Sequence, residues 1–141
     1  MSDHSKSAEE AAKAKGLVVE LPDDNELFVD IDDAVSLETF HKQVLVLNSF
    51  RPCTWKLRPS PSGKPDRWHA TVTLAEAGAQ LTAIERIAMQ ACLGSDRLHE
   101  LLSLRALHRG DNEPTCFFEK PEPAPLNLPP RPIPLLPRYE P

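Results

Sequence analysis

The sequence predicts a single α+β domain built on a four-stranded antiparallel sheet with helices on one face. Of its 141 residues, 40% are hydrophobic and 26% are charged, an ordinary mixture for a globular protein. Apolar residues recur at every second position in some stretches and at every third or fourth position in others, which indicates both strands and helices. Nine of the 15 prolines lie in residues 121–141. We therefore expect a flexible segment at 1–16, a folded domain at 17–120 and a disordered, proline-rich tail at 121–141.

The first half of the domain is typical of a strand, a helix and two further strands. Residues 27–31 (LFVDI) form a short run of strand-forming residues. Apolar residues from 37 to 49 recur at helical spacing, and Ser36 can cap that helix. A proline then breaks the chain. Two strands follow, at 53–57 and 68–74, and a loop rich in proline, serine and glycine joins them.

The second half predicts two helices and a last strand. Thr82 and Glu85 form the capping box of the first helix, and Ser95 or Asp96 caps the second. A strand at 115–119 completes the domain. The residues expected to face inward are Leu81, Ile84, Ile87, Ala88, Ala91 and Cys92 on the first helix, and Leu98, Leu101, Leu102 and Ala106 on the second.

This order of elements belongs to the ferredoxin-like and RNA-recognition-motif (RRM-like) architecture. In that topology the first and third strands are antiparallel neighbours at the centre of the sheet, so the strand at 27–31 should lie beside the strand at 68–74. The tail at 121–141 should extend as polyproline II. Its two PxxP sequences could bind the aromatic groove of a protein partner, and a plain solvated tail is the alternative.

The sequence indicates a cytoplasmic protein that does not enter a membrane. No apolar run approaches the roughly 18 residues needed to cross a bilayer. The N-terminal residues are polar throughout, which argues against a secretory signal. Cys53, Cys92 and Cys116 are odd in number and have unrelated spacings. They support neither a disulfide framework nor a structural zinc site, and a reducing compartment fits them best.

Acidic and basic residues are separated along the chain. Residues 20–38 hold eight acids and no base, whereas residues 51–69 hold five lysines and arginines and a single acid, Asp66. Two solvated faces of a small domain would produce this pattern. A site that holds metal ions on one side and phosphates on the other would produce it as well, provided that the two segments meet in space.

Asp30 and Asp32 are the sharpest candidates for a functional site. Side chains two residues apart on a strand project from the same face, about 7 Å apart. Two carboxylates on one rigid element repel one another unless a cation lies between them, and paired acids of this kind hold the ions of two-metal phosphoryl-transfer sites. The exposed face of an amphipathic strand would show the same alternation, but acids are poor strand formers.

The loop that precedes the strand at 68–74 has the makings of a phosphate-binding site. Its serines and glycine allow close backbone approach, and its two bases add positive charge. The candidate phosphate-binding residues are Ser60, Ser62, Gly63, Lys64 and Arg67. His69 begins the strand and could donate to a phosphate oxygen or act on a nearby proton. A basic hairpin loop beside a solvent-facing histidine is the alternative.

Together, the Asp30–Asp32 strand and the Ser-x-Ser-Gly…His segment resemble motifs I and II of the archaeo-eukaryotic primase superfamily, the primase-polymerases. The resemblance implies that both aspartates bind Mg²⁺ or Mn²⁺ and that Ser62 and His69 face the phosphates of a nucleoside triphosphate. It also implies catalytic roles for Asp30, Asp32 and His69. The third metal ligand of that family has one candidate in this sequence, Asp96, with Arg97 or Arg105 neutralising charge nearby.

Two functions therefore remain open from the sequence. The first is metal-dependent nucleotidyl transfer on nucleic acid. The second is a non-catalytic, ferredoxin-like interaction module that binds a partner through its sheet or its proline-rich tail. The first requires Asp30, Asp32 and His69 to converge within roughly 10 Å on one accessible face of the sheet, a distance over which ions and phosphates can be shared.

Overall fold

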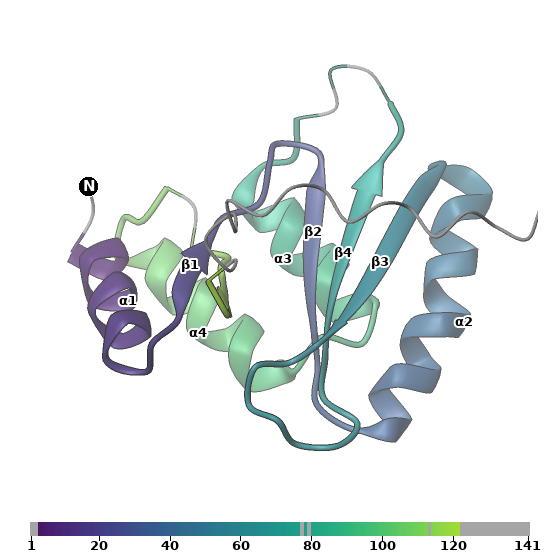
Figure 1. The fold of residues 1–141 in the computed structure, drawn as a ribbon. Coiled ribbons are helices and arrows are strands. Elements are labelled where there is room, and N and C mark those ends of the chain that lie inside the picture. The colour runs from purple at the N-terminus through teal and green to yellow at the C-terminus, as the bar shows by residue number, and fades with distance from the viewer. Residues whose placement is uncertain (1–2, 77, 79, 113, 122–141) are drawn as a thin grey trace, which may run out of the picture.

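A computed structural model describes residues 3–76, 78, 80–112 and 114–121, which form four helices and five strands (Figure 1). These are α1 (Asp3–Ala14), β1 (Val18–Glu20), β2 (Glu26–Ile31), α2 (Ala34–Phe50), β3 (Cys53–Pro59), β4 (Trp68–Leu74), α3 (Ala83–Cys92), α4 (Arg97–His108) and β5 (Phe117–Glu119). In this part of the chain, no helix has both the length and the apolar character needed to cross a membrane. The predictions for the proline-rich tail concern residues outside the described ones, apart from its first residue.

The α+β class is confirmed, but the single four-stranded sheet is wrong. The strands form two antiparallel sheets, one of three strands in the order β2-β4-β3 and one of two strands, β1 and β5. The expected neighbours are confirmed, because β2 pairs with β4 and places Asp30 opposite His69. The last strand, expected in the four-stranded sheet, pairs instead with β1, in a register that places Val18 opposite Glu119.

The outer edge of β2 explains why no fourth strand joins the main sheet. The Phe28 amide donates to Oε1 of Gln90 at 2.8 Å, and the Asp30 amide donates to Oγ of Ser95 at 3.0 Å. The Asp30 carbonyl accepts from the amide of Asp96 at 2.7 Å. These edge contacts, all from α3 and the turn into α4, satisfy backbone groups that a neighbouring strand would otherwise pair with.

The hydrophobic core lies against one face of the three-stranded sheet. Leu27, Val29 and Ile31 alternate along β2 and point into it. Helix α2 and the residues just before and just after α3 supply the facing side chains. The buried cluster consists of Leu27, Val29, Ile31, Phe40, Val44, Leu47, Cys53, Ala70, Val72, Leu74, Leu81 and Leu93. Asp30 and His69 therefore project from the sheet face opposite to this core.

The helix caps agree with the sequence in two of three cases. The Thr82–Glu85 capping box at α3 is confirmed, and Asp96, one of the two expected residues, caps α4. At α2, however, the cap is Asp33, whose carboxylate accepts from the amide of Ser36 at 2.7 Å. Asp33 follows β2 almost directly in an extended conformation, so the helix begins earlier than the apolar spacing indicated.

The expected inward faces of α3 and α4 are wrong in large part. Leu98, Leu101 and Leu102 are 63%, 62% and 50% exposed, whereas Ala106 is buried as predicted. Ile87 of α3 and Leu81, just before this helix, are buried, whereas Ile84 is exposed. Ala88, Ala91 and Cys92 are exposed as well. The side chains that these helices bury are instead mostly polar ones: Arg86, Gln90, Glu100 and Ser103.

Hydrogen bonds to β2 or to one another account for three of these buried polar side chains, Arg86, Gln90 and Glu100. Gln90 Nε2 donates to both carboxylate oxygens of Glu100, at 3.2 and 3.0 Å, and Ser95 Oγ donates to Oε1 of Glu100 at 3.2 Å. The guanidinium of Arg86 donates to the carbonyl of Glu26 at 2.9 Å and to that of Asp23 at 3.0 Å. A buried polar side chain costs free energy unless it is hydrogen-bonded, and each of these has partners.

Residues 3–14 of the segment that was predicted to be flexible form the helix α1. Alanine, lysine and glutamate, which dominate the segment, favour a helix. Ala12 is buried, and its carbonyl accepts from the amide of Leu17 at 2.8 Å where the chain turns toward β1. Figure 1 shows α1 and β1 on the side of β2 and α2 on the side of β3. The N-terminal helix thus lies on the side of the fold that carries Asp30.

Replacing Gln90 tests the edge contacts. Gln90→Leu leaves the buried Phe28 amide without its acceptor and removes two of the hydrogen bonds to the Glu100 carboxylate, so the free energy of unfolding should fall by about 2–4 kcal/mol. Urea denaturation measures this. Gln43→Leu, at an exposed position of α2, is the matched control and should change it by less than about 0.5 kcal/mol. Equal stability of the two variants would contradict a structural role for the edge contacts.

Candidate functional site

Asp30 of β2 and His69 of β4 form a cross-strand pair. Residues directly opposite one another in an antiparallel ladder project from the same face. The Nε2 atom of His69 lies 3.8 Å from Oδ1 of Asp30. The predicted meeting of the acidic and basic segments is confirmed for this pair, while the catalytic roles assigned to it stay predictions.

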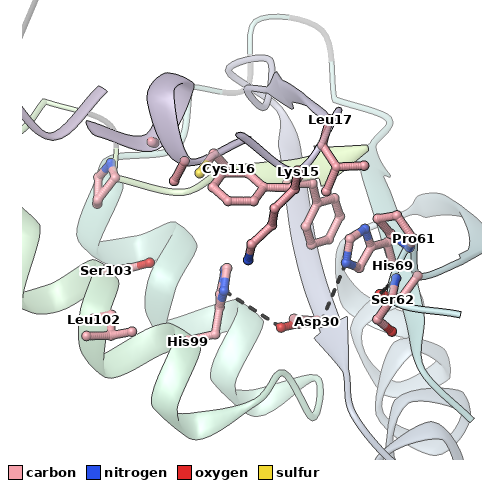
Figure 2. A pocket seen from close by; sticks show the side chains of 16 residues that line it. Lys15, Leu17, Asp30, Pro61, Ser62, His69, His99, Leu102, Ser103 and Cys116 are labelled. Carbon is pink, nitrogen blue, oxygen red and sulfur yellow. Dashed lines mark hydrogen bonds and ion pairs between the residues drawn. The ribbon is translucent and has the colours of Figure 1, made fainter. Parts of the chain in front are cut away.

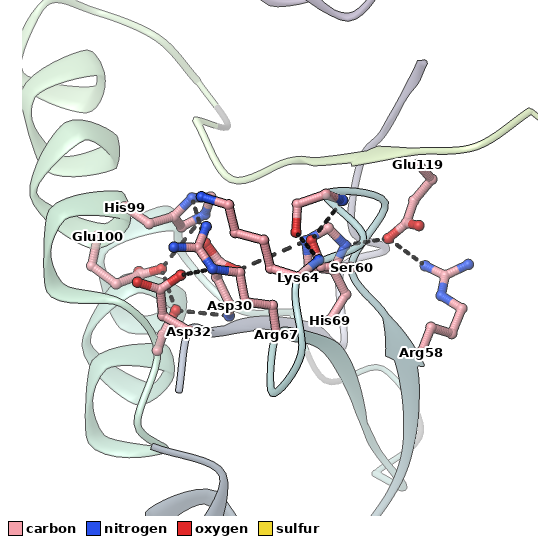
Figure 3. A network of polar contacts seen from close by, with 12 residues as sticks. Asp30, Asp32, Arg58, Ser60, Lys64, Arg67, His69, His99, Glu100 and Glu119 are labelled. Carbon is pink, nitrogen blue, oxygen red and sulfur yellow. Dashed lines mark hydrogen bonds and ion pairs between the residues drawn. The ribbon is translucent and has the colours of Figure 1, made fainter. Parts of the chain in front are cut away.

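Strand β5 covers part of the same face and fixes the imidazole. Glu119 contacts Nδ1 of His69, and the ring of Phe117 stacks on the His69 ring with centroids 4.0 Å apart and planes 6° apart. Phe117 stacks on Phe28 as well. Glu119 also forms an ion pair with Arg58 at 3.4 Å (Figure 3). With Nδ1 turned toward a carboxylate, His69 directs its Nε2 atom toward Asp30.

A second histidine, His99, faces Asp30 from α4. Its Nδ1 atom lies 3.7 Å from Oδ2 of Asp30, so each carboxylate oxygen has an imidazole beside it. Burial raises the pKa of the Asp30 carboxyl above its usual range, and the neighbouring histidines oppose this shift only in part. Sequence reasoning did not identify His99, because the residues around it carry no metal-ligand spacing.

Glu100 lies behind this group and is almost fully buried. Burial raises the pKa of its carboxyl, while hydrogen bonds from Gln90 and Ser95 lower it. His99 Nε2 lies 3.8 Å from Oε1 of Glu100. Neighbouring titratable side chains thus form a row that crosses from β5 through β4 and β2 to α4, and Figure 3 shows most of them: Glu119, His69, Asp30, His99 and Glu100. Clusters of titratable groups with shifted pKa values are typical of functional sites.

The three predicted metal ligands lie near one another but contact different partners. Asp32, just beyond β2, forms an ion pair with Arg67 Nε at 3.2 Å. The carboxylate of Asp96 accepts from an amide in the first turn of α4, and its own amide donates to Asp30. Within the described residues, no three His, Cys, Asp or Glu side chains form a group that could hold a metal ion.

The predicted phosphate-binding loop is compact, and only some of its residues line a pocket. The amide of Ser60 donates to the carbonyl of Arg67 at 2.9 Å, which closes the loop, and Gly63 turns it with a φ of 70°. Ser60 and Ser62 line a pocket beside Asp30 and His69. Gly63, Lys64 and Arg67 are not among the residues that line it, and Lys64 lies exposed on the loop.

The pocket has a volume of about 560 Å³ and contains Asp30, His69 and His99. Lys15, which follows α1, extends its side chain into the pocket from the opposite side (Figure 2). This size is typical of a site for one small molecule. Lys15 and the hydroxyls of Ser60 and Ser62 are hydrogen-bond donors that line the pocket together with a single carboxylate, so the pocket suits an anion that is bound together with a cation. The sequence did not identify Lys15.

No protein-family model, curated protein or solved structure matches the chain significantly. The resemblance to the primase-polymerases therefore stays a prediction. The function has to be inferred from the chemistry of the pocket and of the residues around it.

The raised pKa values predict a dependence of stability on pH. Because folding raises the pKa of Asp30 and of Glu100, the folded protein binds these protons more tightly than the unfolded chain does. The protonated carboxyls of Asp30 and Glu100 contribute fully to stability below about pH 4, near the ordinary carboxyl pKa. This contribution is lost as the pH rises through the raised pKa values of the folded protein. Glu100→Gln should therefore flatten the decrease in unfolding free energy above pH 4, measured by urea denaturation across pH.

Glu10→Gln is the matched control, since Glu10 is an exposed carboxylate on α1. Its profile should run parallel to that of the wild type. If Glu100→Gln also runs parallel to the wild type, the burial of Glu100 has no energetic consequence for folding.

Proposed function

We propose that the chain binds a nucleoside triphosphate together with Mg²⁺ or Mn²⁺ and acts as a nucleotidyl-transfer module similar to the primase-polymerases. One observation carries this proposal: the cross-strand pair of Asp30 and His69 opens into a pocket that Ser60 and Ser62 also line. The motif resemblance assigns Asp30 to the metal and Ser62 and His69 to the phosphates, and the loop composition adds Ser60. Their convergence from two strands and a loop makes a chance arrangement of the motifs a poorer explanation.

The carboxylates of Asp30 and Asp32 are the proposed metal ligands. Mg²⁺ usually binds through one or two carboxylates and the phosphates of its substrate, with water completing the shell. A nucleotide-bound ion therefore needs no third protein ligand, and Asp96 could remain the cap of α4. The ion would neutralise charge on the phosphates and polarise the reacting phosphoryl group.

The ion pair between Asp32 and Arg67 is suited to exchange partners. Asp32 and Arg67 are 39% and 35% exposed, and ion pairs of this kind contribute only about 0–1 kcal/mol. Opening this pair releases Asp32 for a cation and Arg67 for a phosphate. Arg67 then acts from the rim of the pocket, with Lys64 nearby on the same loop, as the sequence predicted for the phosphate-binding loop.

Nucleic acid is the proposed acceptor of the nucleotide, by the same resemblance. The chain has a net charge of −5, which disfavours unassisted binding to a polyanion. A strand should therefore bind only with the divalent cation present. The acceptor is the part of the proposal that depends most on the motifs.

Metal-dependent nucleotide binding tests this function. Millimolar Mn²⁺ with a nucleoside triphosphate should stabilise the wild type by about 2.7 kcal/mol at a ligand concentration 100 times the Kd, seen as a higher Tm. Asp30→Asn combined with Asp32→Asn should abolish the shift, because the proposed ligands are lost. Asp24→Asn, an exposed acid outside the site, is the control and should keep it. Nucleotide incorporation on primed and unprimed templates then measures turnover. No stabilisation of the wild type would contradict the proposal.

The non-catalytic interaction module remains the second candidate, and the exposed leucines of α4 favour it. Leu98, Leu101 and Leu102 are all at least half exposed, and Leu104 is 38% exposed. A groove of about 340 Å³ between α2 and α3 adds Val46 and other apolar side chains. Apolar patches of this kind mark protein-interaction surfaces.

A pull-down with the full chain separates the second candidate from the first. If α4 binds a protein partner, Leu98→Ser combined with Leu101→Ser should release the partner, because the substitutions remove the apolar contact area. Glu38→Ser combined with Lys42→Ser, on the exposed surface of α2 and outside the groove, is the control and should retain it. Retention by the leucine variant, together with nucleotide binding by the wild type, would favour the enzyme.

A further inference from the structure

The pocket beside Asp30 extends well beyond the residues that the proposed function uses. Its polar side consists of Asp30, His69 and the serines of the loop between β3 and β4. Its other side is built by α1, α4 and the chain leading into β5. The residues that line this second side are Ala8, Ala11, Leu102, Ser103, Cys116 and Phe118.

The second side of the pocket is largely apolar and uncharged. Ala8 and Ala11 come from α1, Leu102 from α4 and Phe118 from β5. Burial raises the pKa of the Cys116 thiol to about 11, so this side chain is neutral at physiological pH. Ser103, which is only 4% exposed, supplies a hydroxyl on the same side. Such a surface suits a flat, apolar group that carries a few polar atoms on its edge.

Lys15 and His99 lie between the two sides of the pocket. Lys15 extends into the pocket between α4 and the loop that carries Ser62, and His99 lies below it (Figure 2). An anion held near these groups would lie between the apolar side and the loop. A ligand that fills the whole pocket therefore has an anionic end and a flat apolar end. A nucleotide has both.

We infer that the apolar side holds the heterocyclic base of a single nucleoside triphosphate, whose phosphates lie on the polar side. This inference rests on the proposed function and adds to it the form of the substrate. At about 560 Å³ the pocket has the size of a site for one small molecule. A nucleic-acid strand would instead need an open groove that follows its backbone. The pocket is thus assigned to the free nucleotide, and a strand must lie elsewhere on the surface.

Three probes test this assignment by calorimetry with Mn²⁺ and the full chain: a nucleoside triphosphate, inorganic tripolyphosphate and a short single-stranded oligonucleotide. Burial of a base contributes about 1–3 kcal/mol in stacked complexes, so the nucleoside triphosphate should bind roughly tenfold or more tightly than tripolyphosphate. The oligonucleotide should bind more weakly than the nucleoside triphosphate and should not compete with it.

Two matched pairs of variants locate the base. Leu102→Ser removes an apolar wall, whereas Leu101→Ser alters its exposed neighbour, which does not line the pocket. Ala11→Trp fills the apolar side from α1, whereas Ala14→Trp is an exposed control on the same helix. Leu102→Ser and Ala11→Trp should each weaken nucleoside triphosphate binding severalfold and leave tripolyphosphate binding unchanged. Both controls should bind both probes as the wild type does.

The outcomes separate this inference from the proposed function. If the nucleoside triphosphate and tripolyphosphate bind with equal affinity, or if Leu102→Ser and Ala11→Trp leave both affinities unchanged, the assignment of the base is overturned while phosphate binding stands. If the oligonucleotide displaces the nucleotide, the pocket belongs to a strand and the assignment is overturned as well. If none of the probes binds, the proposed function fails first and this assignment fails with it.

Discussion

The open edge of β2 is the constraint on which the rest of the structure depends. An exposed row of backbone donors and acceptors must be paired or covered. Here Gln90 and the residues that lead into α4 satisfy it, and a fourth strand is thereby excluded from the sheet. The last strand is then free to pair with β1, so its aromatic and acidic side chains lie over the polar face of the sheet. The pocket exists because of this displacement.

The same constraint determines the electrostatics of the site. Gln90 and Ser95 contact β2 and also donate hydrogen bonds to Glu100, which brings a carboxylate into the interior beside His99. Burying a carboxylate costs free energy, and hydrogen bonds from neutral donors compensate for only part of this cost. A protein that keeps such groups next to a pocket gives up stability there, which is common where binding or catalysis requires it.

His69 shows how the two sheets cooperate. Its strand places it opposite Asp30, whereas Glu119 and Phe117 come from the other sheet and hold the ring by a polar contact and by stacking. A carboxylate on one nitrogen of an imidazole orients the ring and leaves the second nitrogen for a ligand. Asp32 has no comparable support, since its partner is an exposed arginine. The site therefore combines a fixed pair, Asp30 and His69, with an ion pair that can exchange partners, Asp32 and Arg67.

The sequence by itself determined the strands at 27–31 and 68–74 and the Thr82–Glu85 cap, because alternation and capping are encoded by neighbouring residues. The pairing of these two strands, which places Asp30 opposite His69, was expected from the fold class and is confirmed. Only the tertiary structure decided that the leucines of α4 face solvent and Glu100 faces inward, since helical spacing separates two faces without stating which one meets the open strand edge. The partner of the short strand β5, and with it the roles of Glu119, His99 and Lys15 around the pocket, likewise depended on contacts between residues far apart in the chain.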